Sequence, residues 1–331
     1  MAAADPCQAA DRDHLAYGPV PSRRLGRSLG INNIPPKACT YSCLYCQVGR
    51  TAWLRRERQD FHAPQDVFRA VRRKLDAARA AGLDVDFLTF VPDGEPTLDR
   101  ALGRTIALLR SLDVPIGVIT NGSLLWRQDV RTDLAEAAWV SVKVDAVEPQ
   151  AWRRVNRPEQ SLTLNRVLAG QQEFAAGFAG ELATETMLVA GVNDGDDQLR
   201  GVADHLRELR PAKAYLGIPT RPPAEAGVTG PDAAVLNRAF HLLAEGVDQV
   251  EYLIAYEGDT FAPTGDAAAD LLGITAVHPM RRQAVESFLA QAGSAWSLVD
   301  GLVAKGDLAK ARYGGHTYYL RRFAGRRGGT S

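Results

Sequence analysis

The feature that most limits the fold of this chain is an alternation of short apolar runs with longer amphipathic stretches. The runs are rich in β-branched residues and almost continuously apolar, as strands buried on both faces are. We predict six such strands, at residues 27–33, 86–91, 115–120, 140–145, 184–192 and 212–219. Six βα units in a row predict an α/β fold with a parallel sheet and right-handed crossovers.

The stretches between the strands carry apolar residues at helical spacing. Pro64 stands before one of them, and proline suits the first turn of a helix. Thr97 is the predicted N-cap of the next helix, over residues 98–109. Further helices are predicted at 127–138, 160–176, 196–209 and 231–245. This pattern alone leaves open whether the sheet closes partway into a barrel or lies flat and doubly wound.

Polar residues collect where the predicted strands end. They are found at 93–97 (DGEPT), 120–123 (TNGS), 145, 193–194 and 220–223 (TRPP). In folds built from βα units, the carboxyl ends of the strands share one edge, and ligands bind there. We therefore expect the chemistry of this protein at that edge.

The cysteines are few and unevenly placed. Three of the four lie within eight positions, at Cys39, Cys43 and Cys46, directly after the first predicted strand. The fourth, Cys7, stands alone near the start. Disulfide frameworks use even, dispersed sets in small secreted chains, so a close triplet in 331 residues indicates a metal site.

Two kinds of metal site fit a cysteine triplet. Three thiolates can ligate three irons of a 4Fe–4S cluster and leave the fourth iron open to another ligand. A zinc ion is the competing interpretation, with His62 or His14 as the fourth ligand. Zinc sites usually pair two Cys-x2-Cys knuckles, and this sequence has one. The donor set therefore favours a cluster.

The segment CTYSCLYC (39–46), with Tyr45 before the last cysteine, resembles the signature of the radical S-adenosylmethionine (SAM) superfamily. The resemblance implies a partial (β/α)6 barrel over residues 20–265, in which a 4Fe–4S cluster cleaves SAM to a 5′-deoxyadenosyl radical. Members carry a Gly-Gly-Glu-like motif for the amino group of SAM after the second strand. Gly94 and Glu95 occupy this place here, with Asp93 at the first glycine position.

Three further segments, 20–33, 184–194 and 219–223, are similar to a bacterial branch related to the wyosine-type tRNA-modifying radical SAM enzymes. This relationship makes RNA a candidate substrate. Wyosine-type enzymes carry additional cysteines for a second cluster, whereas only Cys7 is left over here. The resemblance thus implies one 4Fe–4S cluster, SAM, and an electron donor such as flavodoxin or ferredoxin.

The resemblance and the strand-end positions together supply candidate contacts for SAM. Glu95 is the predicted acceptor for the methionine ammonium, in a charge-assisted hydrogen bond. Asn121 and Asp145 are candidates for the ribose or the carboxylate, although both residue types also serve in ordinary turns and caps. Asn193 is a candidate for the adenine side, and Tyr45 for packing along the adenine. The sequence assigns no catalytic residue.

Several cations stand near the predicted site. Arg23, Arg24 and Arg27 precede the cysteines and either face an anionic substrate or remain in solvent. Lys37 and Lys143 could also reach the strand ends. A Schiff-base lysine would need a pKa depressed by burial or by a nearby positive charge, which the sequence does not test.

The pattern changes after residue 263. Two helices and two strands are predicted there, at 280–291, 295–305, 308–312 and 316–321. They outline a small winged-helix-like domain over 275–323. Residues 1–19 are then an N-terminal extension and 324–331 a flexible tail.

Charge is distributed unevenly along the chain. The net charge is zero, but residues 277–331 hold nine Lys or Arg and three Asp or Glu, a balance of +6. Such a segment is either a solvated basic tail or a binding surface for RNA or another anionic substrate.

We therefore interpret the chain as a radical SAM enzyme that abstracts hydrogen from a substrate the sequence does not identify, with RNA among the candidates. The alternative is a non-catalytic iron–sulfur or zinc protein that binds nucleic acid through its winged helix. The start, MAAADPC, lacks the basic and apolar regions of a signal peptide, and no uncharged apolar run approaches ~18 residues. We expect a cytoplasmic protein without membrane contact.

Overall fold

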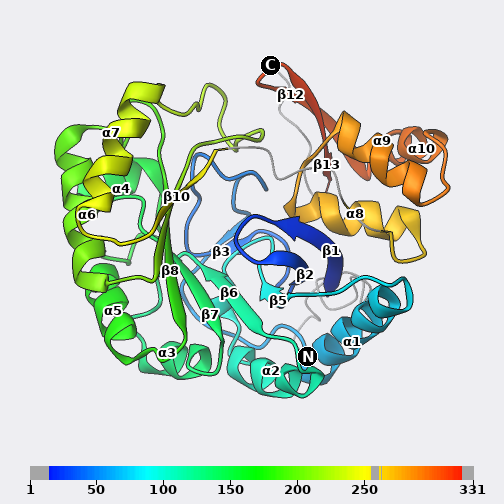
Figure 1. The fold of residues 1–331 in the computed structure, drawn as a ribbon, viewed down its shortest axis with the longest axis horizontal. Helices are drawn as coiled ribbons and strands as arrows, with labels where there is room; N and C mark the ends of the chain where they lie inside the picture. Colours follow the sequence, from blue (N-terminus) through cyan, green and yellow to red (C-terminus); the bar gives the residue numbers. More distant parts are fainter. Residues whose placement is uncertain (1–14, 255–260, 262, 323–331) are drawn as a thin grey trace, which may run out of the picture.

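The computed structural model describes residues 15–254, 261 and 263–322. Its main strands are β1 Ala16–Ser22, β2 Gly26–Ile31, β5 Phe87–Phe90, β6 Ile116–Thr120, β7 Trp139–Lys143, β8 Glu181–Met187, β9 Lys213–Gly217 and β10 Val250–Leu253. They form one eight-stranded sheet in the order β1–β2–β5–β6–β7–β8–β9–β10. β1 pairs antiparallel with β2, and every later neighbour pairs parallel. The sheet curls into an open barrel (Figure 1).

Helices surround the outer face of this sheet (Figure 1). They are α1 Pro64–Ala80, α2 Leu102–Leu109, α3 Gln128–Leu134, α4 Pro149–Val155, α5 Leu164–Gly177, α6 Asp196–Leu209 and α7 Ala233–Ala244. α1 begins at Pro64, as predicted, and buries Val67, Val71 and Leu75 against the strands. Burial of such side chains, at roughly 25 cal/mol per Å² of apolar surface, holds the two layers together. None of the helices in the described part of the chain combines the length and the apolar composition needed to span a bilayer.

The six predicted strands correspond to β2 and β5–β9, which confirms the α/β fold and the partial barrel. Two details differ. β8 ends at Met187 and not at 192, because Asn193 accepts a hydrogen bond from Val189 N in a tight turn. Thr97 is not the N-cap of a helix over 98–109. It lies in a separate 3-10 turn capped by Glu95, and α2 begins only at Leu102.

Among the strands of the eight-stranded sheet and the helices around it, β1, β10 and α4 were not predicted. β1 reads AYGPVPS, and its glycine and two prolines are turn signals. It forms a strand because it pairs with β2 and lies against a helix of the C-terminal region. Short elements of this kind owe their conformation to their neighbours and not to their own residues.

The turn between β1 and β2 enters the open barrel. Leu25 in this turn is buried and packs against residues from β7, β8, β9 and β10, namely Trp139, Ala183, Tyr215 and Leu253. The interior below the carboxyl ends of the strands is therefore filled. Arg23 and Arg24, directly before Leu25, are held inside the barrel as a consequence.

The C-terminal unit, residues 267–321, contains α8 Ala267–Val277, β11 Met280–Arg281, α9 Arg282–Gln291, α10 Ser297–Lys305, β12 Leu308–Tyr313 and β13 His316–Arg321. Its three strands form an antiparallel sheet in the order β11–β13–β12. The two predicted helices and the predicted ribbon are present. Residues 280–281 form a strand and not the start of a helix, because they pair with Tyr318 and Tyr319.

The C-terminal unit is packed onto the barrel and shares a hydrophobic core with it. Tyr17 and Val20 of β1 lie in one cluster with Leu271 and Ile274 of α8. The Tyr318 hydroxyl donates a hydrogen bond of 2.9 Å to Thr220 O, in the loop after β9. The unit therefore stands beside the carboxyl ends of the strands (Figure 1).

Candidate functional site

A cavity of about 240 Å³ opens at the carboxyl ends of the barrel strands. Residues from the cysteine loop, from the loop after β5 and from the ends of β6, β7 and β8 line it. Cys39, Cys43 and Cys46 share this lining with Tyr45, Gly94, Glu95 and Asn121. The structure thus brings together, at the predicted edge, most of the side chains that the sequence indicated.

The cysteine loop is fastened to the loop that carries Glu95. Two short strands, β3 Ala38–Cys39 and β4 Trp53–Leu54, open and close it. Glu95 N donates to Ala38 O at 3.0 Å. A Cβ on Gly94 would lie 2.0 Å from the same oxygen. Only glycine permits this approach, so the Gly94 position is required by the packing of the two loops.

The three thiols have few partners within the protein. Cys43 Sγ accepts a hydrogen bond from Asn156 Nδ2 at 3.4 Å, and Cys39 Sγ accepts one from Tyr41 N at 3.4 Å. Burial raises the pKa of Cys43 to about 12 and the pKa of Cys46 above its usual value, although Lys37 acts to lower the latter. Three thiolates that line one cavity repel one another and need a cationic centre among them. Iron supplies one, so this donor set fits a cluster.

One of the two histidines proposed for zinc is described by the structure. His62 lies outside the residues that line the cavity. His14 and Cys7 lie outside the described residues. Among the residues described, no three His, Cys, Asp or Glu side chains converge on a position for a single metal ion.

Glu95 is buried, 1% exposed, and its carboxylate is held by four hydrogen bonds. Oε1 accepts from Thr97 N at 3.0 Å and from the hydroxyls of Thr97 and Thr120 at 2.6 Å. Oε2 accepts from Asn121 N at 2.8 Å. Burial raises the pKa of this carboxyl, and the four donors act in the opposite direction. Because each carboxylate oxygen has about two acceptor sites, Oε2 retains capacity for a ligand donor.

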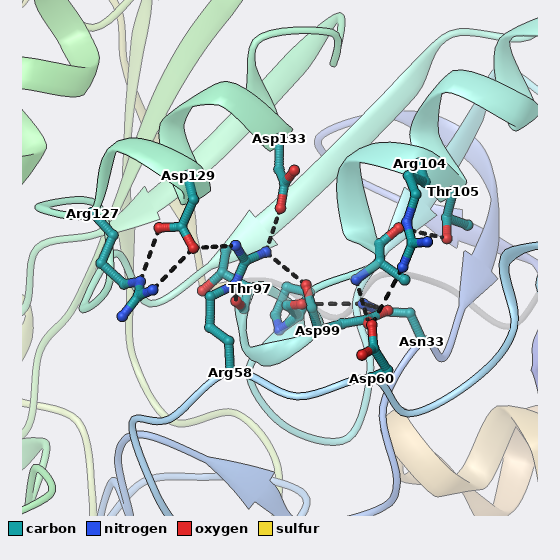
Figure 2. A network of polar contacts seen from close by, with 12 residues as sticks. Asn33, Arg58, Asp60, Thr97, Asp99, Arg104, Thr105, Arg127, Asp129 and Asp133 are labelled. Carbon is teal, nitrogen blue, oxygen red and sulfur yellow. Dashed lines mark hydrogen bonds and ion pairs between the residues drawn. The ribbon is translucent and has the colours of Figure 1, made fainter.

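A polar network stands behind the Glu95 loop (Figure 2). Arg58, whose side chain is 4% exposed, donates to Thr97 O at 2.8 Å and Asp99 O at 2.7 Å. The same guanidinium pairs with Asp129 at 2.8 Å and with Asp133. The network thereby ties the Glu95 loop to α3.

Two of the predicted SAM contacts are used inside the protein. Asp145 accepts from the Tyr45 hydroxyl, from Asn156 Nδ2 at 2.7 Å and from Met187 N at 2.8 Å. Asn193 donates to Asp145 O at 2.7 Å and Met187 O at 2.8 Å. Neither Asp145 nor Asn193 belongs to the cavity lining. Their side chains join the ends of β7 and β8.

The other predicted contacts face the cavity. Asn121 Nδ2 donates to the Thr40 hydroxyl at 2.7 Å, while the amide lies 3.6 Å from Cys39 Sγ. The ring of Tyr45 lies 5.7 Å from Lys143 Nζ. Both side chains therefore belong to the lining that the cysteines share.

One side of the cavity, which we name the cationic wall, consists of Arg23, Arg24, Lys143 and Arg221. Glu185 lies between two of them: its Oε2 is 3.1 Å from Arg24 and its Oε1 is 2.9 Å from Lys143. Arg27 does not belong here, since it donates to Asp84 O at 3.2 Å on the exposed surface.

Lys143 is held as an ammonium ion. Burial acts to lower its pKa, but the charges of Glu185 and Asp145 outweigh burial, and the pKa lies above its usual value. A Schiff-base lysine needs the opposite shift. The environment therefore suits Lys143 for ion pairing and not for nucleophilic attack.

Sequence reasoning missed Glu185, Arg221 and Arg58. Glu185 had a signal, because an acid inside an apolar strand requires partners when it is buried. Arg221 stands in the TRPP segment, which was noted as polar and strand-terminal. Arg58 had no signal, since it lies in a polar loop between the cysteines and α1.

Comparisons with known proteins agree with this geometry. The family model described as Radical SAM superfamily matches residues 33–201. A UPF0026 protein of Methanocaldococcus jannaschii is 40% identical over 94% of this chain and 97% of its own length. Two solved structures share the fold. One, titled as a radical SAM methyltransferase from Sphaerobacter thermophilus, has a TM-score of 0.54 and 19% identity, and covers 69% of this chain and 67% of its own. The other, titled as TYW1 with a lysine-pyruvate adduct bound, has a TM-score of 0.52 and 16% identity. It covers 68% of this chain and 76% of its own.

Proposed function

The chain belongs to the radical SAM superfamily and to the UPF0026 proteins, and we propose from this that Cys39, Cys43 and Cys46 hold its cluster while a substrate in the same cavity loses a hydrogen atom. Enzymes of this class use a 4Fe–4S cluster and SAM, and they generally need an electron donor. Flavodoxin or ferredoxin would suit that role. The bound cofactors supply the reducing and radical chemistry, and the protein supplies orientation and exclusion of water.

The observation that carries the proposal is one continuous cavity that joins the cysteines, the Glu95 loop and the cationic wall. Glu95 Oε2 offers an acceptor site for the ammonium of SAM, in a position fixed by Asn121 N at 2.8 Å. Gly94 allows this carboxylate to approach the cysteine loop. Burial of the pair strengthens such a charge-assisted contact, because water does not compete for it.

Two further roles follow from the contacts at the strand ends. Tyr45 and Asn121 face the cavity, and we assign them to the adenosine part of SAM. Asp145 and Asn193 act by positioning: Asp145 accepts from the Tyr45 hydroxyl, and Asn193 holds Asp145 O at 2.7 Å. Asn193 was a candidate for direct contact with adenine, and its amide is instead committed to the backbone of this turn.

The test is anaerobic reconstitution of the full chain with iron and sulfide. We expect about four irons per chain, a brown colour, and release of 5′-deoxyadenosine from SAM after reduction. Cys43→Ala should lose the cluster and all SAM cleavage. Glu95→Gln should keep the iron and weaken SAM binding at least tenfold, whereas Glu208→Gln, on the exposed side of α6, should match the wild type. A colourless protein with one zinc per chain would contradict the proposal.

RNA is the second candidate substrate, and an exposed pair of cations on β12 favours it. Lys310 and Arg312 alternate along the strand and therefore point to the same face. The unit runs helix, strand, helix, helix, strand, strand, and we propose that it is the winged-helix-like domain expected from the sequence. α10 exposes only Asp300 and Lys305 as charged residues, so contact through β12 is favoured over contact through this helix.

Fractionated cell extract separates the two substrate classes. Incubation of the reduced enzyme with labelled SAM should show whether the RNA fraction or the small-molecule fraction stimulates cleavage. If RNA is the substrate, Lys310→Glu together with Arg312→Glu should abolish the stimulation and leave basal cleavage unchanged. Stimulation by small molecules alone would exclude RNA.

A further inference from the structure

We propose that Asn156 raises the reduction potential of the cluster by donating a hydrogen bond to the thiolate of Cys43. Asn156 caps the C-terminal end of α4 and lies 113 positions after Cys43 in the sequence. It acts through this cysteine and not on SAM or substrate, so it is a positioning residue. The inference rests on the proposed function, because the cluster is the one assigned there to the three cysteines.

The side-chain amide of Asn156 stands between two acceptors. Its Nδ2 lies 3.4 Å from Cys43 Sγ and 2.7 Å from Asp145 Oδ2, and the residue is 2% exposed. An amide nitrogen carries two hydrogens, so it can serve both acceptors at once. Asp145 Oδ1 in turn accepts from Met187 N at 2.8 Å. The carboxylate therefore holds the amide with its nitrogen, and not its oxygen, toward the sulfur.

The backbone around Asn156 keeps the amide and the sulfur together. Asn156 O accepts a hydrogen bond from Ser42 N at 3.0 Å. Val155 O accepts one from Leu44 N, also at 3.0 Å. Cys43 lies between Ser42 and Leu44, so the residues on both sides of it are fastened to the end of α4. The distance from the amide to the sulfur is thus fixed by main-chain contacts.

A hydrogen bond at this place acts on the charge of the cluster. Reduction adds one electron and increases the negative charge on the sulfurs. An N–H group that points at a ligating sulfur stabilises this charge, and such hydrogen bonds are among the factors that set cluster potentials. The effect is stronger where water is excluded, as around the buried Asn156. Removal of the donor should therefore make the cluster harder to reduce.

The side chain of Asn156 can be changed without altering the lining of the cavity, to which it does not belong. A second contact to a cysteine sulfur, from Tyr41 N to Cys39 Sγ at 3.4 Å, comes from the backbone and persists in every variant. Asn121 also approaches Cys39, at 3.6 Å, but it is assigned to SAM. Asn156 is therefore a position where the contribution of a sulfur hydrogen bond can be measured apart from ligand binding.

The experiment is a redox titration of the reconstituted full chain without SAM, followed by electron paramagnetic resonance of the reduced cluster. Asn156→Leu removes both N–H groups and keeps a side chain of similar volume. We expect its equilibrium constant for reduction to fall about five- to tenfold, which is roughly 40–60 mV for one electron. Iron content should stay at the wild-type value. Gln150→Leu, an amide-to-leucine change at an exposed position of α4, is the matched control and should leave the potential unchanged.

Asn156→Val, with a smaller apolar side chain, covers the case in which circular dichroism shows that leucine disturbs the fold. Equal potentials in the Asn156 variants, in Gln150→Leu and in wild type, at equal iron content, would overturn the inference alone. Loss of iron from both Asn156 variants would also overturn it, because Asn156 would then be needed to assemble the loop and not to set the potential. A wild-type protein that takes up no iron contradicts the proposed function instead.

Discussion

The polar network behind the Glu95 loop and the cationic wall differ in how their charges are matched. In the network, arginines are matched with aspartates: Arg58 pairs with Asp129 and Asp133, Arg127 with Asp129, and Arg104 with Asp60 (Figure 2). Arg100 also pairs with Asp60, at 3.1 Å. On the wall, Glu185 pairs with two cations, Arg24 at 3.1 Å and Lys143 at 2.9 Å. The first region satisfies its own charges and supports a loop. In the second, one carboxylate is shared by two cations.

The contrast separates two uses of buried arginine. Arg58 makes hydrogen bonds to two backbone carbonyls and pairs with two acids, so its donors are used within the protein. Arg24 pairs with one oxygen of Glu185, and its Nε–H has no acceptor among the residues that the structure describes. Residue type alone therefore does not indicate a binding site. The balance of partners around the residue does.

Removal of Arg58 should have the largest effect on stability. Arg58→Met leaves Asp129, Asp133 and two carbonyls without their donor. Because the guanidinium is 4% exposed but Asp129 is half exposed, we expect a loss of about 2–4 kcal/mol in unfolding free energy. The melting temperature should fall by roughly 3–6 °C. Arg127→Met, at the exposed end of the network, should cost less than about 1 kcal/mol. Equal losses would show that the network does not act as a buried support.

Gly94→Ala tests whether the supported loop must touch the cysteine loop. The new Cβ would lie 2.0 Å from Ala38 O. The backbone of Ala38 would have to shift to relieve this clash, and such a shift would also move Cys39, the next residue. We expect at least a tenfold loss of SAM cleavage, with iron content as a second measurement. Gly177→Ala, where no atom lies within 4 Å of the added methyl group, should behave as wild type. Full activity in Gly94→Ala would show that the contact is dispensable.

Asp99 makes the balanced network sensitive to pH. Burial raises the pKa of Asp99 to about 7 from 3.8, while hydrogen bonds from Ala101 N and Asn33 act to lower it. Because the folded-state pKa is raised, Asp99 contributes stability below about pH 4, and this contribution is lost as the pH rises through 7. Unfolding free energies measured from pH 4 to 8 should fall by on the order of 2–4 kcal/mol more in wild type than in Asp99→Asn. If unfolding free energy depends on pH in the same way in wild type and in Asp99→Asn, the titrating group is not Asp99. Asp60→Asn, which removes an exposed acid of the network, is the control.

Glu185→Gln tests the role of the acid in the cationic wall, and it has the smallest expected effect of these variants. It removes the carboxylate that pairs with both Arg24 and Lys143, at 3.1 and 2.9 Å. The amide cannot pair with two cations, so we expect a loss of about 1–2 kcal/mol in unfolding free energy, measured by denaturant titration. An unchanged free energy would mean that Glu185 does not hold the two cations in place. Glu251→Gln, which removes the pair with Lys213 at 2.7 Å outside the cavity, should cost less than about 1 kcal/mol.

The predictable part of the fold was the part that local pattern encodes. β2 and β5–β9 are apolar runs of the expected length, and Pro64 does begin α1. The turn at 188–194 and the cap at Glu95 depend on side chains that bind backbone several residues away, and pattern reasoning misplaced both boundaries. β1 forms from a Gly- and Pro-containing segment only because β2 lies beside it.

The candidate site also has a part that the sequence predicted and a part that it did not. Spacing placed Cys39, Cys43 and Cys46 together, and the strand-end rule placed Glu95 and Asn121 beside them. Spacing could not show that Asp145 binds the Tyr45 hydroxyl, since these residues are 100 positions apart. It also could not distinguish Arg24, inside the barrel, from Arg27, on its surface.

The sequence by itself determined the donor set, the order of the βα units and the edge at which they meet. These depend on residue type and short spacing, which a linear pattern records. Only the tertiary structure decided that Arg58 supports the Glu95 loop, that Arg24 and Lys143 share Glu185, and that the C-terminal unit closes the cavity at Val277. Each is a contact between residues at least 39 positions apart, and its energy depends on burial and on charge balance, which arise only when the chain has folded.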